Sequence, residues 1–445
     1  MKRRVLAGLL TCVMLFGLLP ATALADGYEA KNGETAYETL DEAIAEASGG
    51  DTIELLADAE TEAGFGLNGK TLTVCGNGHK ITFTGKTIYL AKSGDTPAVL
   101  NFENCTIDMT QTVGTPAING ESYPSSAIIL NWDCQLNLTN TDLQMDGSSY
   151  DGSSLDGSSL KGSTACYMHA GAGMTLTNST MIAENYAYNG FSADDGNYDV
   201  SVTLDHSSMT LNGNRTGFNS NYVVTAKNES CLKVTNSRGH GSNGADYFID
   251  NSVVLYDGNG SHGMSARNVI ITNGSDVTSS NNRYYGVYVN GSGDFKVDGT
   301  SSLTANYNGY AGLRLLESSS KTGVVESGAK VVIDGNASDG FWNQRTAVFA
   351  DGSYLEIMKN YDAGKGGGIY NTGNLTLPGD AKVCNNHAAE AGDDIYNLGT
   401  IAFGPVGSGW ELDGISSRHI AWAQSCRALE VSPRGEPRLY STGKG

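Results

Sequence analysis

Proline, basic residues and long apolar segments are all scarce in this chain. Only 8 of its 445 residues are proline, which leaves most of the backbone able to pair as strands, because proline cannot donate to a β-ladder. Lys and Arg number 28 against 48 Asp and Glu, a formal net charge of −20 that repels nucleic acid and anionic membranes. Beyond residue 25 no apolar stretch is long enough to span a bilayer. We therefore expect no nucleic-acid partner and no membrane span in the mature chain.

Several motifs that carry enzyme chemistry are also missing. The chain has no phosphate-binding loop, no Cys/His set with zinc spacing and no motif centred on a nucleophilic serine. It has 8 cysteines, and Cys12 lies in the leader, so an odd number remains that cannot all pair within one chain. We expect mostly buried free thiols and no required cofactor.

The first 25 residues have the pattern of a secretory signal peptide. Basic residues 2–4 precede an apolar core from Val5 to Leu19, and residues 23–25 (Ala-Leu-Ala) form a small-x-small cleavage site. We therefore assign residues 1–25 to a signal peptide and expect a secreted, extracellular or cell-surface protein.

Glycine is abundant, at 58 residues, and much of it belongs to a repeat. In Leu303–Leu316 (LTANYNGYAGLRLL), alternating runs flank an Asn/Gly corner, which predicts strand, corner, strand because Asn and Gly tolerate left-handed backbone angles. Similar units begin at Leu100, Leu136, Met174, Val202, Leu232, Phe295 and Leu375, with corner residues Asn104, Asn140, Asn178, His206, Asn236, Gly299 and Gly379. A fixed period of about 20–50 residues indicates a repeat architecture. The sequence predicts an all-β solenoid.

Asparagine at matching corners predicts a particular stabilising contact. Coils of a β-solenoid stack about 4.8 Å apart, so that asparagine amides in successive coils can hydrogen-bond as a ladder. We expect such a ladder at Asn104, Asn140, Asn178 and Asn236.

Residues 26–58 predict one short helix followed by the first strand. Thr39 and Glu42 have capping-box spacing, and Leu40, Ala43, Ile44 and Ala47 share one helical face. An open solenoid end exposes apolar core, so an amphipathic cap is expected there.

The remaining boundaries follow from composition. Residues 59–414 carry the repeat, interrupted at 146–163 by Asp-Gly-Ser-Ser repeats that bury too little apolar surface to pack and predict a flexible loop. Residues 415–445 lose the alternation. We interpret them as an irregular tail, or as the truncated or frame-shifted end of a longer surface protein.

These patterns resemble the pectin-lyase-like superfamily. TLDEAIAEASGGDTIEL (from Thr39) is similar to the N-terminal cap of its secreted members, and the coils resemble its repeats. GGGIYN (from Gly366) is similar to repeats of bacterial surface adhesins, including polymorphic membrane proteins. The resemblance implies a single-stranded right-handed parallel β-helix with a short N-terminal capping helix.

The resemblance also points to candidate chemistry. Polygalacturonases of this fold carry Gly-His-Gly after an Asp-Asp pair, and here Asp194-Asp195 precede the His240 motif. Hydrolysis would use paired carboxylates, so Asp194, Asp195 and His240 are catalytic candidates, although the other polygalacturonase motifs are missing. Asp194, Asp195 and Asp199 are also candidate Ca²⁺ ligands, because Ca²⁺ prefers oxygen donors. A solvated loop and a turn histidine are the structural alternatives.

Aromatic residues gather after the corners. Exposed rings along one face would stack on sugar rings, and we name Tyr284, Tyr288, Tyr310 and Trp342 as candidate ligand-binding residues. The main hypothesis is a non-catalytic, adhesin-like monomer that binds polysaccharide or glycoprotein surfaces. The alternatives are a polysaccharide lyase or glycoside hydrolase of the same fold, and a structural spacer of a longer surface protein.

Overall fold

The computed structural model describes residues 27–85, 87–110, 126–148, 163–193 and 199–404, together with the backbone of three short strands beyond residue 419. The predicted signal peptide, the catalytic candidates Asp194 and Asp195, and most of the predicted loop at 146–163 lie outside these residues. Among the described residues, no helix is long and apolar enough to cross a membrane.

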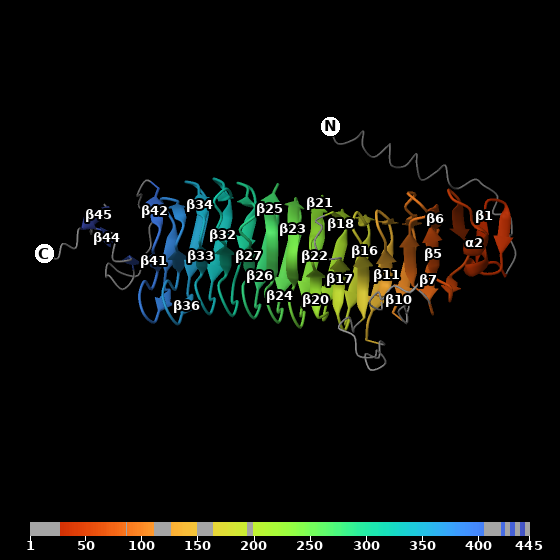
Figure 1. The fold of residues 1–445 in the computed structure, drawn as a ribbon, viewed down its shortest axis with the longest axis horizontal. Helices are drawn as coiled ribbons and strands as arrows, with labels where there is room; N and C mark the ends of the chain where they lie inside the picture. Colours follow the sequence, from red (N-terminus) through yellow and green to blue (C-terminus); the bar gives the residue numbers. More distant parts are fainter. Residues whose placement is uncertain are drawn as a thin grey trace, which may run out of the picture.

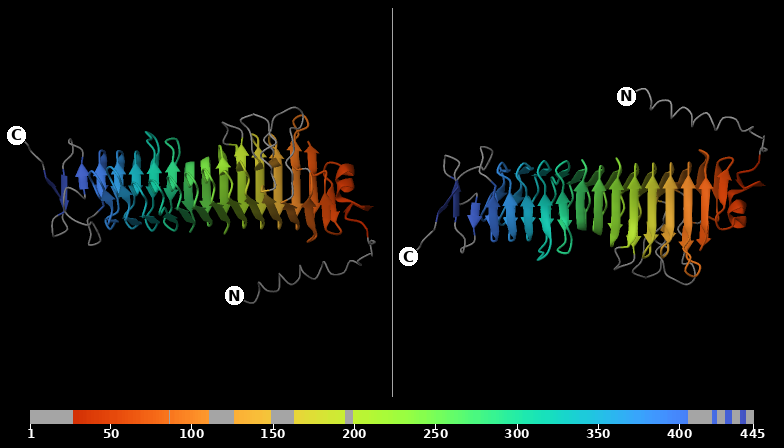
Figure 2. Two further views of the ribbon diagram at one scale, coloured as in Figure 1. Left: turned by 90° about the horizontal axis from the view of Figure 1, so that it is seen from below. Right: turned by 90° about the horizontal axis from the view of Figure 1, so that it is seen from above.

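The chain winds into a rod of stacked coils (Figure 1), most of which contain three short strands, while in two coils the nine-residue strands β23 (Ser242–Asp250) and β25 (Met264–Thr272) each span two of these positions. One coil contains β27 (Val287–Val289), β28 (Phe295–Val297) and β29 (Ser302–Thr304), and the next contains β30 (Leu313–Leu315), β31 (Thr322–Val325) and β32 (Lys330–Asp334). Each strand pairs with its counterpart one coil along, β27 with β30, β28 with β31 and β29 with β32. Strands of successive coils therefore lie side by side along the whole rod (Figure 2).

The predicted all-β solenoid is confirmed. One of its sheets holds 13 parallel strands, at one strand a coil. In most strands the side chains alternate between buried and partly exposed, as in β9 (Val99–Glu103), whereas β11 (Ser126–Leu130) and β17 (Asn189–Ala193) are buried at every residue. Leu, Val, Ile and Phe from every coil thus enter one continuous core, in which most of these side chains are fully buried. Burial of about 25 cal/mol for each Å² of apolar surface is the main term that stabilises such a core.

The corner prediction is confirmed at five of its seven positions. The backbone is left-handed at Asn104, Asn140, Asn178, His206 and Asn236, with φ between 47° and 55°. Gly299 and Gly379 lie in turns but do not adopt positive φ, so glycine is not required there by the backbone angle.

Ladders of polar side chains run along two of the corners. The Asn140 amide donates to Asn104 Oδ1 at 3.1 Å as predicted, whereas Asn236 donates to Asn212 and so departs from the predicted row. The longer asparagine ladder is buried, and each amide donates to the next side-chain oxygen at 2.8–3.0 Å through Asn259, Asn282, Asn308, Asn336, Asn360 and Asn386. A hydroxyl ladder joins Thr141 to Ser179, Ser207, Ser230, Ser252, Ser275 and Ser301 through backbone N–H donors.

A short helix lies at the N-terminal end of the rod (Figure 1). Helix α2 (Leu40–Glu46) begins after Thr39, whose hydroxyl accepts a hydrogen bond from the Glu42 N–H at 3.2 Å. Leu40, Ala43 and Ile44 are buried on one face. That the helix protects the end of the core stays a prediction.

Three short strands are described beyond residue 419. Strand β43 (Ile420–Trp422) pairs in parallel with β41 (Ile395–Asn397), and β44 (Ala428–Val431) pairs antiparallel with β45 (Pro437–Tyr440). Parallel pairing therefore extends past residue 414, where the sequence pattern weakens.

Candidate functional site

A row of large side chains crosses five consecutive coils of the C-terminal half. The row consists of Tyr288, Arg314, Trp342, Tyr370 and Tyr396, which lie opposite one another in β27, β30, β33 (Phe341–Asn343), β37 (Ile369–Asn371) and β41. We call it the aromatic row. Each residue is the middle one of a three-residue strand and is partly exposed while both its neighbours are buried. Strand alternation therefore points all five side chains outward at the coil spacing of about 4.8 Å.

The members of the aromatic row contact one another. The Arg314 guanidinium lies 3.7 Å from the Trp342 ring centroid and 5.5 Å from that of Tyr288. Beyond Trp342, the Tyr370 ring lies 5.7 Å away in an edge contact, and Tyr396 stacks on Tyr370 at 5.5 Å. Arg314 also donates to Gln344 Oε1 at 3.0 and 3.2 Å, which holds its planar group in place. The row is thus a continuous strip of rings with one cation within it.

A second row of rings approaches Tyr288 from the preceding turns. The His240 ring lies 4.9 Å from the His262 ring at a tilt of 42°, and the His262 ring stacks on those of Tyr285 and Tyr288 at 5.0 Å and 5.8 Å. Burial lowers the pKa of His240, and burial together with His240 and Arg314 lowers that of His262 to about 4. Both imidazoles are therefore neutral near pH 7 and extend the ring surface without adding charge.

Glycine allows these turns to lie against the asparagine ladder. A Cβ on Gly286 would lie 2.6 Å from Asn308 Nδ2 and 2.7 Å from the Gly312 carbonyl oxygen, and one on Gly340 would lie 2.6 Å from Asn360 Nδ2. No larger residue fits between the buried amides and the ring-bearing turn, so the ladder and the ring surface are built by the same short motif.

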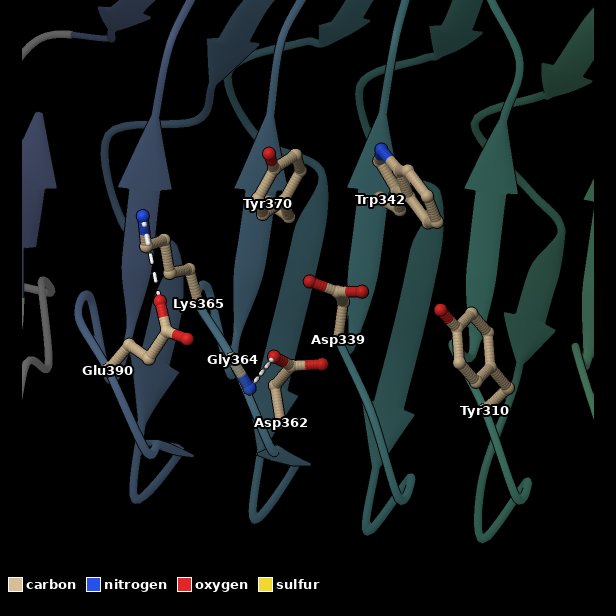
Figure 3. Close-up of a pocket in the computed structure, with 8 residues that line it drawn as sticks. All are labelled: Tyr310, Asp339, Trp342, Asp362, Gly364, Lys365, Tyr370 and Glu390. Carbon is tan, nitrogen blue, oxygen red and sulfur yellow. Dashed lines mark hydrogen bonds and ion pairs between the residues drawn. The ribbon is translucent and has the colours of Figure 1, made fainter. Parts of the chain in front are cut away.

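Tyr310, Asp339, Trp342, Asp362, Gly364, Lys365, Tyr370 and Glu390 line a cavity of about 340 Å³ beside the aromatic row (Figure 3). Asp339 precedes β33 and Asp362 belongs to β36 (Tyr361–Asp362) one coil along. The Ser338 hydroxyl lies 2.7 Å from Asp362 Oδ2 and 3.3 Å from Asp339 Oδ2, so it bridges the two carboxyl groups. The cavity thus places two carboxyl groups next to exposed rings.

The two carboxyl groups have different surroundings. Asp362 Oδ1 accepts the Gly364 N–H at 2.6 Å, whereas Asp339 is 5% exposed and its buried Oδ1 has no hydrogen-bond partner. Burial, together with the neighbouring Asp362, raises the pKa of Asp339 to about 8. Asp339 therefore holds a proton at neutral pH, which is the state required of a general acid. Lys365 forms an ion pair with Glu390 at 3.6 Å on the far side of the cavity.

The structure brings the four predicted aromatic residues together. Tyr284 and Tyr310 are 45% and 37% exposed, and their rings lie 5.8 Å from His262 and 5.0 Å from Tyr285, respectively. Tyr288 and Trp342 belong to the aromatic row itself. His240 lies at the end of the same surface and is half-buried, with Nδ1 lacking a hydrogen-bond partner, rather than standing as an isolated surface turn histidine.

The acidic candidates are placed differently. Asp199 lies exposed in the turn before β18 (Val200–Asp205), while Asp194 and Asp195 are outside the described residues. Among the residues that are described, no group of three or more His, Cys, Asp or Glu side chains is arranged to hold a metal ion. The catalytic and Ca²⁺ assignments of Asp194 and Asp195 therefore stay predictions.

Sequence reasoning missed Arg314, Asp339, Asp362, Tyr370 and Tyr396. The signal for three of them was present, because an alignment of the repeats YYGVY, YAGLR, SDGFW and GGGIY on their third residue places Tyr288, Arg314, Trp342 and Tyr370 in one column. Tyr396 falls in the same column when Asp394 is aligned with the glycine that is the third residue of the other repeats. The Asp339–Asp362 pair had no such signal, because Ser338 brings the two together across coils.

No protein-family model matches the chain, and no curated protein matches it significantly. Among solved structures, the crystal structure of the periplasmic alginate epimerase AlgG aligns at 10% identity with a TM-score of 0.32, over 84% of this chain and 85% of that one. A point mutant of the same enzyme aligns at 10% identity with a TM-score of 0.33 over the same shares. The function is therefore argued from this chain's own site.

Proposed function

We propose that this protein is an exported glycan-binding solenoid that holds a polysaccharide chain along the aromatic row. The observation that carries the proposal is the alignment of Tyr288, Arg314, Trp342, Tyr370 and Tyr396 on one outward line, with one residue in each coil. Sugar rings present apolar C–H faces that stack on aromatic rings, while their hydroxyl groups need polar partners at the edges. The carboxyl and hydroxyl groups of Asp362, Glu390 and Tyr310 supply such partners beside the row.

The repeat supports a linear ligand rather than a compact one. Because the rings recur once a coil and follow the rod axis, the surface offers equivalent contacts along its length, as a polymer does. The predicted signal peptide supports export, and a glycan or glycoprotein on a cell surface is the partner expected for an exported protein. The assignment requires no cofactor, and Ca²⁺ stays a separate prediction at Asp199 and its neighbours.

Retention on insoluble glycans tests the proposal. Purified protein is mixed with cellulose, chitin, xylan and mannan, and the bound fraction is measured for wild type and for Trp342→Ala. We expect wild type to bind at least one of these glycans and Trp342→Ala to bind it about tenfold more weakly, a change of roughly 1.4 kcal/mol. Tyr354→Ala is the matched control, because Tyr354 is 40% exposed on β35 (Tyr354–Met358), in a different sheet. Equal losses in both variants, or no retention of wild type, would contradict the proposal and favour a spacer.

A further inference from the structure

Asp339 is buried without the ion pair that a second buried aspartate of this protein, Asp246, makes. Asp246 is buried to a similar extent, at 2% exposed, and its Oδ1 accepts from Arg267 Nε at 2.9 Å while Arg267 Nη2 contacts Oδ2. Asp339 has no such ion pair, and its Oδ1 has no partner at all. An unpaired buried carboxyl group costs free energy, and such costs are concentrated at functional sites.

The Asp339 side chain lines the cavity beside the aromatic row. Asp339 projects from the turn toward the space between Trp342 and Tyr370, and Asp362 lies below it in the same cavity (Figure 3). A sugar held on these rings would therefore lie within reach of both carboxyl groups. Two carboxyl groups with different protonation, placed on one sugar, are the arrangement that glycoside hydrolysis uses.

Ser338 sets the separation of the pair. Its hydroxyl reaches Asp362 Oδ2 at 2.7 Å and Asp339 Oδ2 at 3.3 Å, so these two oxygens lie within about 6 Å of each other. Retaining glycosidases hold their carboxyl groups about 5–5.5 Å apart, whereas inverting enzymes need about 6.5–9.5 Å to admit a water molecule between them and the sugar. The spacing favours direct attack by a carboxylate.

We propose that Asp339 and Asp362 are the proton donor and the nucleophile of a retaining glycoside hydrolase acting on a neutral glycan bound along the aromatic row. This inference rests on the proposed function, because the row must first hold the chain.

The reaction balances with water as the only co-reactant. The glycosidic C–O bond breaks as the Asp339 proton passes to the departing oxygen and an Asp362 oxygen bonds to the anomeric carbon. Asp339, now ionised, then takes a proton from water as the water oxygen attacks that carbon and releases Asp362. One molecule of water has been added across the glycosidic bond, and both residues are back in their starting states.

Charge selects the class of glycan. Asp339 is protonated at neutral pH and Lys365 pairs with Glu390, so among the lining residues Asp362 carries a negative charge that no lysine of the cavity balances. The whole chain carries a formal net charge of −20. An anionic polymer such as polygalacturonate would be repelled, so a neutral polysaccharide is the expected substrate.

The test measures hydrolysis and binding separately. The full-length exported chain is incubated with xylan, mannan, mixed-linkage β-glucan and polygalacturonate, and new reducing ends, retention on each insoluble glycan and the anomeric form of the first product by proton NMR are recorded. The cavity variants are Asp339→Asn and Asp362→Asn. The control is Asp334→Asn, because Asp334 is 9% exposed and contacts Tyr307 and Lys359 outside the cavity.

We expect wild type to release reducing ends from a neutral glycan with retained configuration. Both cavity variants should lose about 100-fold or more of this rate while they still fold and are still retained on the glycan, and Asp334→Asn should stay within about threefold of wild type. Retention of wild type on a neutral glycan without release of ends from it would overturn the catalytic pair and leave the binding proposal standing. Undiminished hydrolysis in Asp339→Asn, or inverted product, would overturn the assigned roles, and absence of retention on every glycan would remove the proposed function itself.

Discussion

The middle and the later coils of the rod use the same strand pairing but present different surfaces. The register row that carries Tyr288 in the later coils continues backward through the small polar residues Ser265, Asn243, Asn219 and Ser192, and large side chains return only further back, at Tyr167, Ile129 and Tyr89. The core behind this row is apolar in both regions. Strand pairing and core packing therefore do not determine the surface. The ring-lined site depends on which residue each coil places at the single outward position of this row.

Two corners of the rod differ as well. A hydroxyl ladder runs along one corner from Thr141 to Ser301, and the asparagine ladder runs along another corner from Asn259 to Asn386, so the two overlap in the middle of the rod and only the asparagine ladder reaches the last of these coils. The Ser230 hydroxyl accepts a hydrogen bond from one neighbouring coil, whereas the Asn336 amide donates hydrogen bonds to the coils on both sides. A corner built from asparagine thus makes more hydrogen bonds between coils than a corner built from serine.

The largest expected effect concerns pH. Because the pKa of Asp339 is about 8 when folded and about 3.9 when unfolded, the folded state keeps a proton between these values that the unfolded chain releases. Its contribution is fully present below about pH 4 and declines by up to about 1.4 kcal/mol for each pH unit as pH rises toward 8. Asp339→Asn should remove this slope in urea-unfolding curves measured between about pH 5 and about pH 8.

Asp108, in the earlier coils, is the matched control for this prediction. Burial raises the pKa of Asp108, but hydrogen bonds from Lys80 and Thr110 outweigh burial and lower the pKa below its usual value. The contribution of Asp108 to the free energy of unfolding is therefore lost only as pH falls. Asp108→Asn should therefore change stability in acid and keep the wild-type slope near neutrality. An unchanged slope in Asp339→Asn would show that Asp339 is ionised in the folded protein.

A second prediction concerns the asparagine ladder. Asn336→Ala removes donors to the Ala305 carbonyl and Asn360 Oδ1 and an acceptor for the backbone and side-chain N–H groups of Asn308. Several buried groups lose partners at once, so we expect the free energy of unfolding to fall by about 3–5 kcal/mol. Urea denaturation measures this, with the exposed Asn374→Ala as control. A loss below about 1 kcal/mol would mean that water replaces the amide.

The hydroxyl ladder should be less sensitive. Ser230 accepts one backbone N–H from Ser207 and donates to the Lys227 carbonyl, so Ser230→Ala breaks two hydrogen bonds. We expect a loss of about 1–2 kcal/mol in the same denaturation experiment. The exposed Ser319→Ala should stay within about 0.5 kcal/mol of wild type. If Ser230→Ala lowers the free energy of unfolding as much as Asn336→Ala does, the two corners do not differ in how strongly they join the coils.

The smallest expected effect comes from making one late coil resemble a middle one. Tyr370→Asn places in β37 the residue found at Asn219 and Asn243 of the same register row. Because Tyr370 is only partly buried, its removal should change stability little, while glycan binding weakens about threefold to tenfold, or about 0.7–1.4 kcal/mol. Retention on the bound glycan measures this, and Tyr361→Asn, exposed on β36, is the control. Unchanged binding would exclude Tyr370 from the site.

Much of the fold was predictable from local pattern. Alternation predicted strands, and the asparagines at positions 104, 140 and 178 predicted left-handed corners, because both are properties of neighbouring residues. The predicted ladder was confirmed between Asn104 and Asn140, whereas the longer ladder from Asn259 to Asn386, at another corner, was not predicted because its members come from coils of unequal length. Hydrogen bonds along it join residues between 23 and 28 positions apart.

The sequence by itself determined the repeat, the solenoid class and the aromatic character of the later corners, since each depends on residue types at short spacing. Only the tertiary structure decided which side chains share a line and which acids share a cavity. Asp339 and Asp362 meet because one hydrogen-bonded coil lies directly on the next, and Asp339 keeps its proton because that stacking removes it from water. Stacking register and burial are properties of the assembled coils, and no single coil contains them.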